Sequence, residues 1–398
     1  MNPASSATAL PQRLASIDAY RGLVMLLMLG EVLALGQVAS QHPDSGFWKF
    51  LAHHQSHVEW VGCTLHDLIQ PSFSFLVGVA LPFSLASRVA KGQTFGQMLR
   101  HAIGRSLILI FLGIFLRSIG KPHTNYTFED TLTQIGLGYT FLFLIGRKTE
   151  KIQWLWFAVL MVGYWLAFAL YPLPGPDFDW KQAGVPVDWP HHLSGFAAHW
   201  NKNSNFAWAF DTWFMNLFPR ERPFLNNGGG YSTLSFIPTL GTMLLGSIAG
   251  LWLQRETTAK EKMIRLLIAG ISGLFLGSLL HLSGICPIVK RIWTPAWTLF
   301  SGGFAFLFLA GFYAIIDFKR WKKWSFFLVV VGMNSIAAYV MEWLFIGFFR
   351  SAIRTHLGDG YLNLFGPSFS SLIQGMTILL LLWLILFWMY RRKLFLKI

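Results

Sequence analysis

The chain has 398 residues, of which 54% are hydrophobic and 13% charged, with a formal net charge of +14. This composition is too apolar for a soluble domain. The excess of basic residues is interpreted as loop charge facing an anionic membrane surface, so no nucleic-acid partner is expected. The apolar residues form blocks of about 20, the length that crosses a bilayer as a helix, and they lack the alternating period of barrel strands. We predict an all-α polytopic membrane protein surrounded by the lipid bilayer.

About ten transmembrane helices are predicted, all in one domain that covers residues 1–398. A long outer loop at 172–232 separates the fifth span from the sixth. Its density of tryptophan argues against disorder, and we expect it to pack as a lid over the outer mouth. The predicted spans are 22–39, 68–87, 102–119, 131–146, 152–171, 233–253, 264–281, 296–316, 326–347 and 369–390.

The charge distribution predicts which way the chain is inserted. Lys and Arg gather in RVAKGQ, RKTEK, QRETTAKEK, FKRWKK and YRRKLFLKI, all on one side of the ten spans. Of the 12 histidines, only His101 lies on that side. By the positive-inside rule this side is the cytoplasm, and it holds both termini.

The stretch HHQSHVEWVGCTLHDLIQP (53–71) gathers titratable side chains just before the second span. Asp67 lies where the helix enters the membrane, and an ionisable residue there is costly, so it usually has a partner and a function. A histidine held by a carboxylate is a general base, and His57 is our candidate. For His53 and His54 we favour ordinary interfacial residues. No HExxH or paired CxxC motif is present, so no metal site is expected.

Further polar residues lie in or at the ends of spans. Several of these residues lie in the outer half of the membrane, which predicts a polar cavity that opens outwards. The alternative is that they form hydrogen bonds between helices. At the other face, Arg21 and Arg105 either extend to the lipid headgroups or bind the phosphates of a cytoplasmic ligand. Cys63 and Cys286 both fall near outer span ends, either as a disulfide or as two small buried side chains. The polar residues are Glu31, Gln134, Asn334 and Glu342.

Several motifs then identify a resemblance. RLASIDAYRG, the pattern H-x-x-W-x-G-x-T-x-x-D-L-I-x-P from His57 to Pro71, and FLVGVALPFSL are similar to the heparan-α-glucosaminide N-acetyltransferase family of transmembrane acyltransferases. The likeness continues in TLTQIGLGY, NNGGGYSTLSFIPTLGTMLLGSIAG, KRIWTPAWTLFSGGFAF and GMNSIAAYV, so it covers nearly the whole chain. The NNGGGYSTLSFIPT version resembles the bacterial branch, which implies the bacterial inner membrane. The chain departs from the family at Leu29–Val32, where the family commonly has V-N.

The resemblance implies acetyl transfer across a membrane, from cytoplasmic acetyl-CoA to an amino sugar on the other side. His57 matches the histidine regarded as catalytic in the family, either as acetyl carrier or as base, and Asp67 matches the aspartate that would orient it. For the acceptor we select Glu31, Trp60, Trp293 and Asn334, and for acetyl-CoA we select Arg21 and Arg105. Whether the chain forms a homodimer stays open. Two alternative functions also stay open: O-acylation of an envelope glycan, and secondary transport without chemistry.

Overall fold

The structure, a computed structural model, describes residues 14–396; residues 1–13, 397 and 398 of the predicted domain lie outside this range. The described chain is helical, and its one ladder contact is an isolated bridge between Val61 and Val289. The helices are α1 Ala15–Leu29, α2 Leu35–Gln41, α3 Gly46–His54, α4 Ile69–Ala90, α5 Phe95–Ser118, α6 Thr131–Gly146, α7 Glu150–Ala169, α8 Phe206–Phe214, α9 Phe236–Gln254, α10 Ala259–Leu282, α11 Pro295–Phe312, α12 Phe326–Gly332, α13 Ser335–Leu362 and α14 Ser370–Arg391.

Long apolar helices confirm a polytopic membrane protein. Eight of those in residues 14–396 are long and apolar enough to cross a bilayer, or nine if the bent segment formed by Ala15–Leu33 and Leu35–Gln41 is one span. Two shorter apolar helices, Thr131–Gly146 and Lys323–Gly332, add to these. Each of the ten predicted segments overlaps one of these helices or a broken pair of them.

Two predicted spans are not continuous, which corrects the expectation of unbroken helices. The span at 22–39 bends by 43° at Ala34, whose backbone is left-handed with φ 49°. The Gln55 side chain holds this bend, because it donates to Gly30 O and accepts from the Leu35 amide. The span at 326–347 breaks at Asn334, where φ −125° and ψ 38° leave the helical region and separate α12 from α13.

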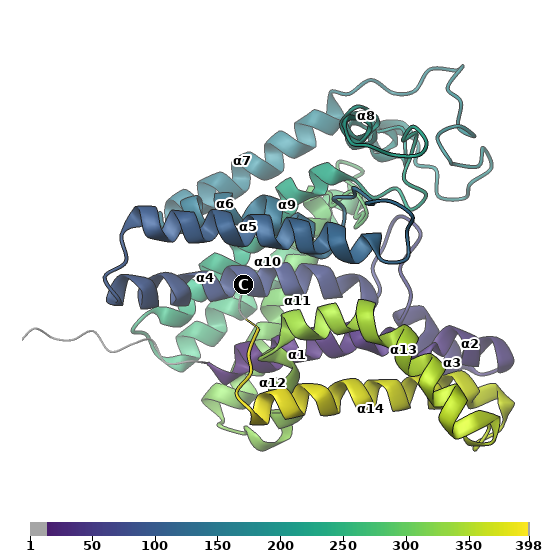
Figure 1. The fold of residues 1–398 in the computed structure, drawn as a ribbon. Helices are drawn as coiled ribbons and strands as arrows, with labels where there is room; N and C mark the ends of the chain where they lie inside the picture. Colours follow the sequence, from purple (N-terminus) through teal and green to yellow (C-terminus); the bar gives the residue numbers. More distant parts are fainter. Residues whose placement is uncertain (1–13, 397–398) are drawn as a thin grey trace, which may run out of the picture.

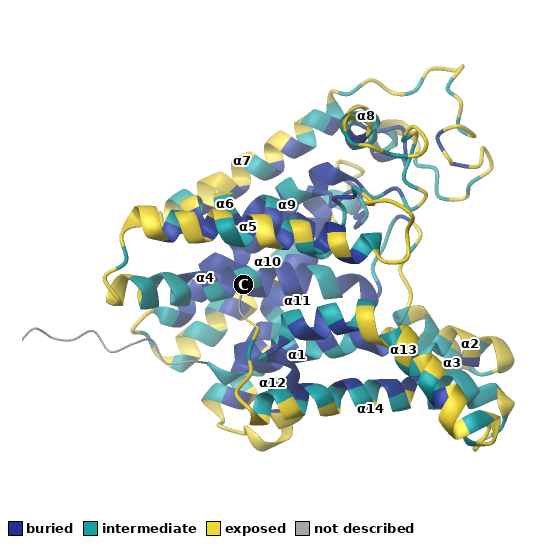
Figure 2. Cartoon of the chain, viewed as in Figure 1, coloured by how far each residue is buried: buried dark blue, intermediate teal, exposed yellow. Residues whose placement is uncertain are grey.

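The central helices approach one another closely where glycine replaces a side chain. In lipid, helices associate through packing and not through the hydrophobic effect, so small residues allow close backbone contact. A Cβ on Gly78 of α4 would lie 1.9 Å from Met243 O of α9, and one on Gly246 would lie 1.9 Å from Phe75 O. α4 and α9 therefore pack backbone to backbone, and Figure 2 shows that this region is buried while α5, α7 and α13 expose their outer faces.

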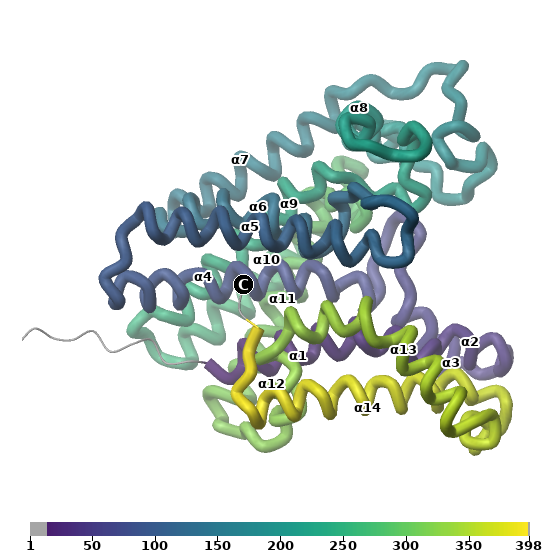
Figure 3. The backbone as a smooth tube through the Cα atoms, in the orientation of Figure 1, coloured from purple at the N-terminus to yellow at the C-terminus, as the bar shows by residue number. Residues whose placement is uncertain are grey.

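The helices run roughly side by side, and the connecting segments gather at two ends (Figure 1). α2, α3 and α8 all lie toward one end, at the right of the view, which we call the α8 end. The tube in Figure 3 shows that α1 and α5 both begin at the opposite end. The stretch 53–71 therefore reaches the α8 end, beside the segment between α7 and α9.

Prediction for the central helix pair. We expect Gly78→Ala to lower the free energy of unfolding by about 1–3 kcal/mol or more, because its Cβ meets a backbone carbonyl that cannot move aside cheaply. The matched control is Gly163→Ala on the exposed face of α7, where no heavy atom lies within 4 Å of the added Cβ. Thermal unfolding in detergent, followed by tryptophan fluorescence, measures both. Equal melting temperatures for the two variants would contradict the close packing.

Candidate active site

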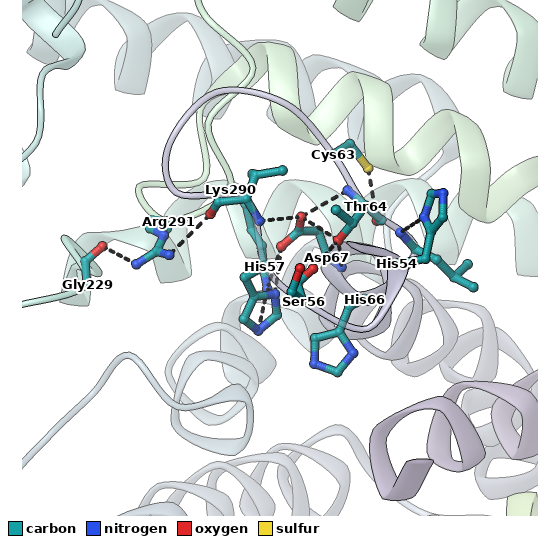
Figure 4. Close-up of polar contacts among 12 residues, drawn as sticks. His54, Ser56, His57, Cys63, Thr64, His66, Asp67, Gly229, Lys290 and Arg291 are labelled. Atoms are coloured by element: carbon teal, nitrogen blue, oxygen red, sulfur yellow. Dashed lines mark hydrogen bonds and ion pairs between the residues drawn. The ribbon is translucent and has the colours of Figure 1, made fainter. Parts of the chain in front are cut away.

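His57 and Asp67 form the centre of the site. His57 lies in the loop after α3, and Asp67 lies in the short 3-10 helix His66–Leu68 that leads into α4. The His57 Nδ1 atom is 2.7 Å from Asp67 Oδ1. Because an ionised carboxylate only accepts hydrogen bonds, Nδ1 carries the proton and Nε2 keeps its lone pair. The spacing H-x₉-D thus produces a histidine oriented by a carboxylate, as predicted from the sequence (Figure 4).

The tight loop between these residues supplies further donors to Asp67. The Asp67 side chain is fully buried, and its Oδ2 atom accepts from the Thr64 amide at 3.0 Å and from the Val58 amide at 3.3 Å. A buried carboxylate is tolerated only with such partners. The loop therefore holds the carboxylate in place, and the carboxylate holds the loop.

Lys290 is a site residue that the sequence analysis missed. Its ammonium group is 3.3 Å from Asp67 Oδ1, 3.0 Å from His57 Nδ1 and 3.4 Å from His57 Nε2, and its side chain is 5% exposed. The available signal was a lysine followed closely by an apolar span, in KRIWTP, where a buried cation is costly unless paired.

The loop before α11 positions Lys290 through its backbone. The Trp293 amide donates to Lys290 O at 2.8 Å, and Trp293 itself is left-handed with φ 48°. Thr294 then caps α11, with Pro295 in its first turn, a position that needs no amide donor. The bridge between Val61 and Val289 joins this loop to the one that carries His57.

The electrostatics favour a neutral His57 ring. Burial lowers the pKa of His57; the bond to Asp67 opposes this, and the charge of Lys290 lowers the pKa further. Burial also lowers the pKa of Lys290, while Asp67 opposes the loss of its proton. A lowered pKa means that a larger fraction of His57 has an unprotonated Nε2 at a given pH. Such a group can act as a base or as a nucleophile.

The segment Asn227–Tyr231 closes another side of the site. Arg291 clamps it, donating to Gly229 O at 2.7 Å and to Val58 O at 3.2 Å. Gly230 has φ 77°, and a Cβ there would lie 2.6 Å from the ring of Trp60. Glycine is needed at this position for both reasons. The glycine-rich motif thus brings the segment between α7 and α9 against the loop that carries His57.

A cavity of about 630 Å³ opens beside these residues. This volume is typical of small-molecule sites. It receives residues from α1, the His57 loop, α5, the segment before α9, the loop before α11, and α13. Its polar lining includes Glu31, His57, His66, Arg117, Glu129, Asn227, Tyr231, Lys290, Tyr339 and Glu342.

The comparisons with known proteins agree with the motifs. Heparan-alpha-glucosaminide N-acetyltransferase from Homo sapiens is 25% identical over 436 residues, which cover 98% of this chain and 61% of the human protein. The mouse (Mus musculus) protein of the same name is 25% identical over 431 residues, covering 97% of this chain and 60% of its own length. The resemblance to a heparan-α-glucosaminide N-acetyltransferase-like family is confirmed. No family model matches the chain. The chain spans about three fifths of the length of these relatives.

Of the predicted acceptor residues, the structure brings only Glu31 to the cavity. Trp60 is fully buried and donates to Trp200 O, so its ring has no face open to a sugar. Trp293 is buried too and donates to Thr242 Oγ1. Asn334 donates to Leu394 O and accepts from the Leu396 amide, so it anchors the C-terminal segment. The structure gives these three side chains packing and anchoring contacts instead of the expected place at the cavity.

The predicted donor residues also lie outside this cavity. Arg21 is 3.6 Å from Asp18 in α1. Arg105 donates to the Tyr139 hydroxyl at 3.2 Å and stacks on that ring. Both lie in helices that begin at the end opposite to the α8 end (Figure 3). Their contact with acetyl-CoA stays a prediction.

Cys63 and Cys286 are free thiols. Burial raises the pKa of each to about 12, so neither supplies a thiolate nucleophile at neutral pH. Within residues 14–396, no three His, Cys, Asp or Glu side chains are grouped as metal ligands would be.

Prediction for Lys290. In Lys290→Met the pKa of His57 should rise, because the charge that lowers it is gone. Only the neutral ring reacts with diethyl pyrocarbonate, so modification of His57 should fade at a higher pH in the variant than in the wild type. Mass spectrometry of the His57 peptide across a pH series measures this. The control is Lys262→Met. Lys262 donates to Leu253 O and lies on the side that is predicted to face the cytoplasm. An unchanged His57 profile in Lys290→Met would contradict the assigned coupling.

Proposed function

We propose that this chain is a membrane acetyltransferase that transfers the acetyl group of acetyl-CoA to a glucosamine-like amino sugar. The observation that carries the proposal is the His57–Asp67 pair, buttressed by Lys290 and opening into a cavity of about 630 Å³. The printed name of the human and mouse relatives supports the same chemistry. A histidine–carboxylate pair would also suit a proton relay in a transporter, and the printed name of the relatives favours the transferase.

In this proposal Asp67 holds the Nδ1 proton of His57, and Nε2 faces the substrates. As a base, Nε2 takes a proton from the acceptor amine while the nitrogen attacks the thioester carbonyl carbon. As a carrier, Nε2 attacks that carbon itself, the carbon–sulfur bond breaks and CoA leaves as a thiolate. The acceptor amine then attacks the acetyl carbon, the Nε2–carbon bond breaks, and the proton lost by the amine ends on the CoA sulfur. The lowered pKa of His57 suits both routes, since each needs the unprotonated ring.

The membrane arrangement is proposed from charge and position. We propose that the bacterial inner membrane holds the protein, with both termini in the cytoplasm and the α8 end outside. The acceptor then enters at the α8 end, where the segment 172–232 acts as a lid and contributes Asn227, Gly229 and Tyr231 to the cavity. Acetyl-CoA enters from the opposite end, past Arg21 and Arg105.

Prediction for the reaction. Purified protein in detergent is mixed with radiolabelled acetyl-CoA, with and without glucosamine. We expect glucosamine-dependent transfer in the wild type and loss to background in His57→Ala, with acetyl-CoA affinity unchanged because the base acts on the acceptor side. His123→Ala, which removes an exposed histidine outside the cavity, should transfer normally.

The same experiment separates the alternatives. Label on the wild-type protein without acceptor, absent from His57→Ala, identifies the carrier route. Product bearing an ester in place of an amide identifies an O-acyltransferase. Loss of acetyl-CoA affinity in His57→Ala would overturn the assigned geometry, and a wild type that binds no acetyl-CoA would favour the transporter.

Prediction for the donor side. Arg21→Ala and Arg105→Ala should each weaken acetyl-CoA binding by roughly ten-fold or more, because each removes a charge-assisted contact with phosphate. Isothermal titration calorimetry in detergent measures the affinity. Arg265→Ala, on α10 and outside the cavity that His57 lines, is the matched control. If both test variants bind acetyl-CoA as tightly as the wild type, these arginines contact lipid headgroups and not acetyl-CoA.

A further inference from the structure

A second histidine–carboxylate pair lies beside the first. His66 Nε2 is 2.8 Å from Glu31 Oε1, and both side chains line the cavity that His57 lines. The ring centroids of His57 and His66 are 4.5 Å apart, with the planes tilted by 47°. Figure 4 shows the two rings next to each other, projecting from the same side of the loop. The site therefore contains two candidate bases, each with its own carboxylate.

The second pair lies on a turn that the neighbouring loop holds in place. Glu31 lies in the 3-10 turn Gly30–Leu33, which Gln55 ties to the loop before His57 through Gly30 O and the Leu35 amide. The His66 side chain is buried, with 7% exposed, whereas Glu31 is 51% exposed. No residue in the described range 14–396 bonds His66 Nδ1. With the Nε2 proton directed at Glu31, Nδ1 keeps a lone pair.

The number of protons in the reaction distinguishes amine from hydroxyl acceptors. An aliphatic amine arrives at neutral pH as an ammonium ion, which has no lone pair and must lose one proton before it can attack. The nitrogen then bonds to the thioester carbonyl carbon, the carbon–sulfur bond breaks, and the nitrogen loses a second proton. One of the two protons ends on the sulfur of CoA, and the other leaves to solvent. A hydroxyl acceptor loses only one proton, for which one base is sufficient.

We propose that His66, held by Glu31, removes the first proton from an acceptor that binds as a protonated amine, and that His57 removes the second. His66 passes its proton through the exposed Glu31 carboxylate to water, whereas His57 returns its proton to the CoA sulfur. This inference rests on the proposed acetyltransferase function. It deepens that function by naming the acceptor as an ammonium ion and by giving the histidine at 66 a chemical role.

The charges around the two rings support a cationic acceptor. The two cations of the lining are already compensated: Lys290 lies 3.3 Å from Asp67 Oδ1, and Arg117 lies 3.2 Å from Asp130 Oδ2. For Glu342, no hydrogen bond or ion pair exists with the described part of the chain. The remaining titratable groups that line the cavity are Glu31, Glu129, Glu342, Tyr231 and Tyr339.

Glu31 and Glu129 leave the cavity wall with excess negative charge. Such a wall attracts an ammonium group and offers nothing comparable to a neutral alcohol. Recognition and proton removal therefore select for the same acceptor chemistry.

The test compares two acceptors in the full-length protein in detergent, with release of free CoA thiol as the readout. Glucosamine is the protonated acceptor. An O-alkyl hydroxylamine is the second, because its weakly basic amine is uncharged at neutral pH. In His66→Asn we expect kcat/KM for glucosamine to fall by roughly ten-fold at pH 7 and by more at lower pH, because the variant can use only the small neutral fraction of the amine. The rate should recover as pH rises and glucosamine loses its proton. With the alkoxyamine the variant should stay within about two-fold of the wild type.

Two further variants guard against a folding defect. Glu31→Gln removes only the partly exposed carboxylate and should show the same acceptor-dependent and pH-dependent loss in weaker form. His281→Asn, a histidine of α10 outside the cavity, should match the wild type on both acceptors.

The outcomes separate this inference from the proposed function. Equal losses on both acceptors at every pH, or no loss on either, would overturn the role of His66 while the acetyltransferase stands. A wild type that acetylates only hydroxyl acceptors would overturn the ammonium acceptor. A wild type that acetylates nothing would overturn the proposed function, and the inference with it.

Discussion

Asp67 places a carboxylate where no part of its side chain reaches solvent, and much of the site is arranged around that charge. It bonds His57, the Lys290 ammonium and the backbone amides of Val58 and Thr64. A buried charge without such partners costs several kcal/mol, so each of these contacts constrains the position of the others. The ring, the cation and the loop between them therefore form one unit, and displacing the Lys290 cation leaves the Asp67 carboxylate without its ion-pair partner.

This unit joins parts of the chain that are distant in sequence. His57 and Lys290 are separated by 233 positions, yet their loops share the bridge between Val61 and Val289. Arg291 extends the same connection to the glycine-rich segment through Gly229 O. Such contacts require the helices behind them to be in register, which the close α4–α9 packing at Gly78 and Gly246 provides. The rigidity of the membrane bundle is thus the condition for a rigid site.

Prediction from sequence succeeded where the physical signal is local. Apolar blocks identify helices because a helix makes all of its backbone hydrogen bonds within itself, as lipid requires. All ten predicted segments coincide with helical parts of the chain. Within one loop, spacing and the cost of an intramembrane carboxylate were enough to pair His57 with Asp67. The bends at Ala34 and Asn334 were missed, since their causes are side-chain bonds to Gln55 and to the C-terminal segment, both distant in sequence.

The sequence by itself determined the membrane class, the helical segments and the oriented histidine, because hydrophobicity and short spacing act on neighbouring residues. Only the tertiary structure decided which polar residues share the cavity. It brought Lys290 to Asp67 and Glu31 to His66, and it buried Trp60 and Trp293, which had been expected at the acceptor. An aromatic ring or a charge has the same sequence signature whether it faces a ligand or another side chain. Its partner is chosen by the packing of whole helices, and that choice has no local trace in the sequence.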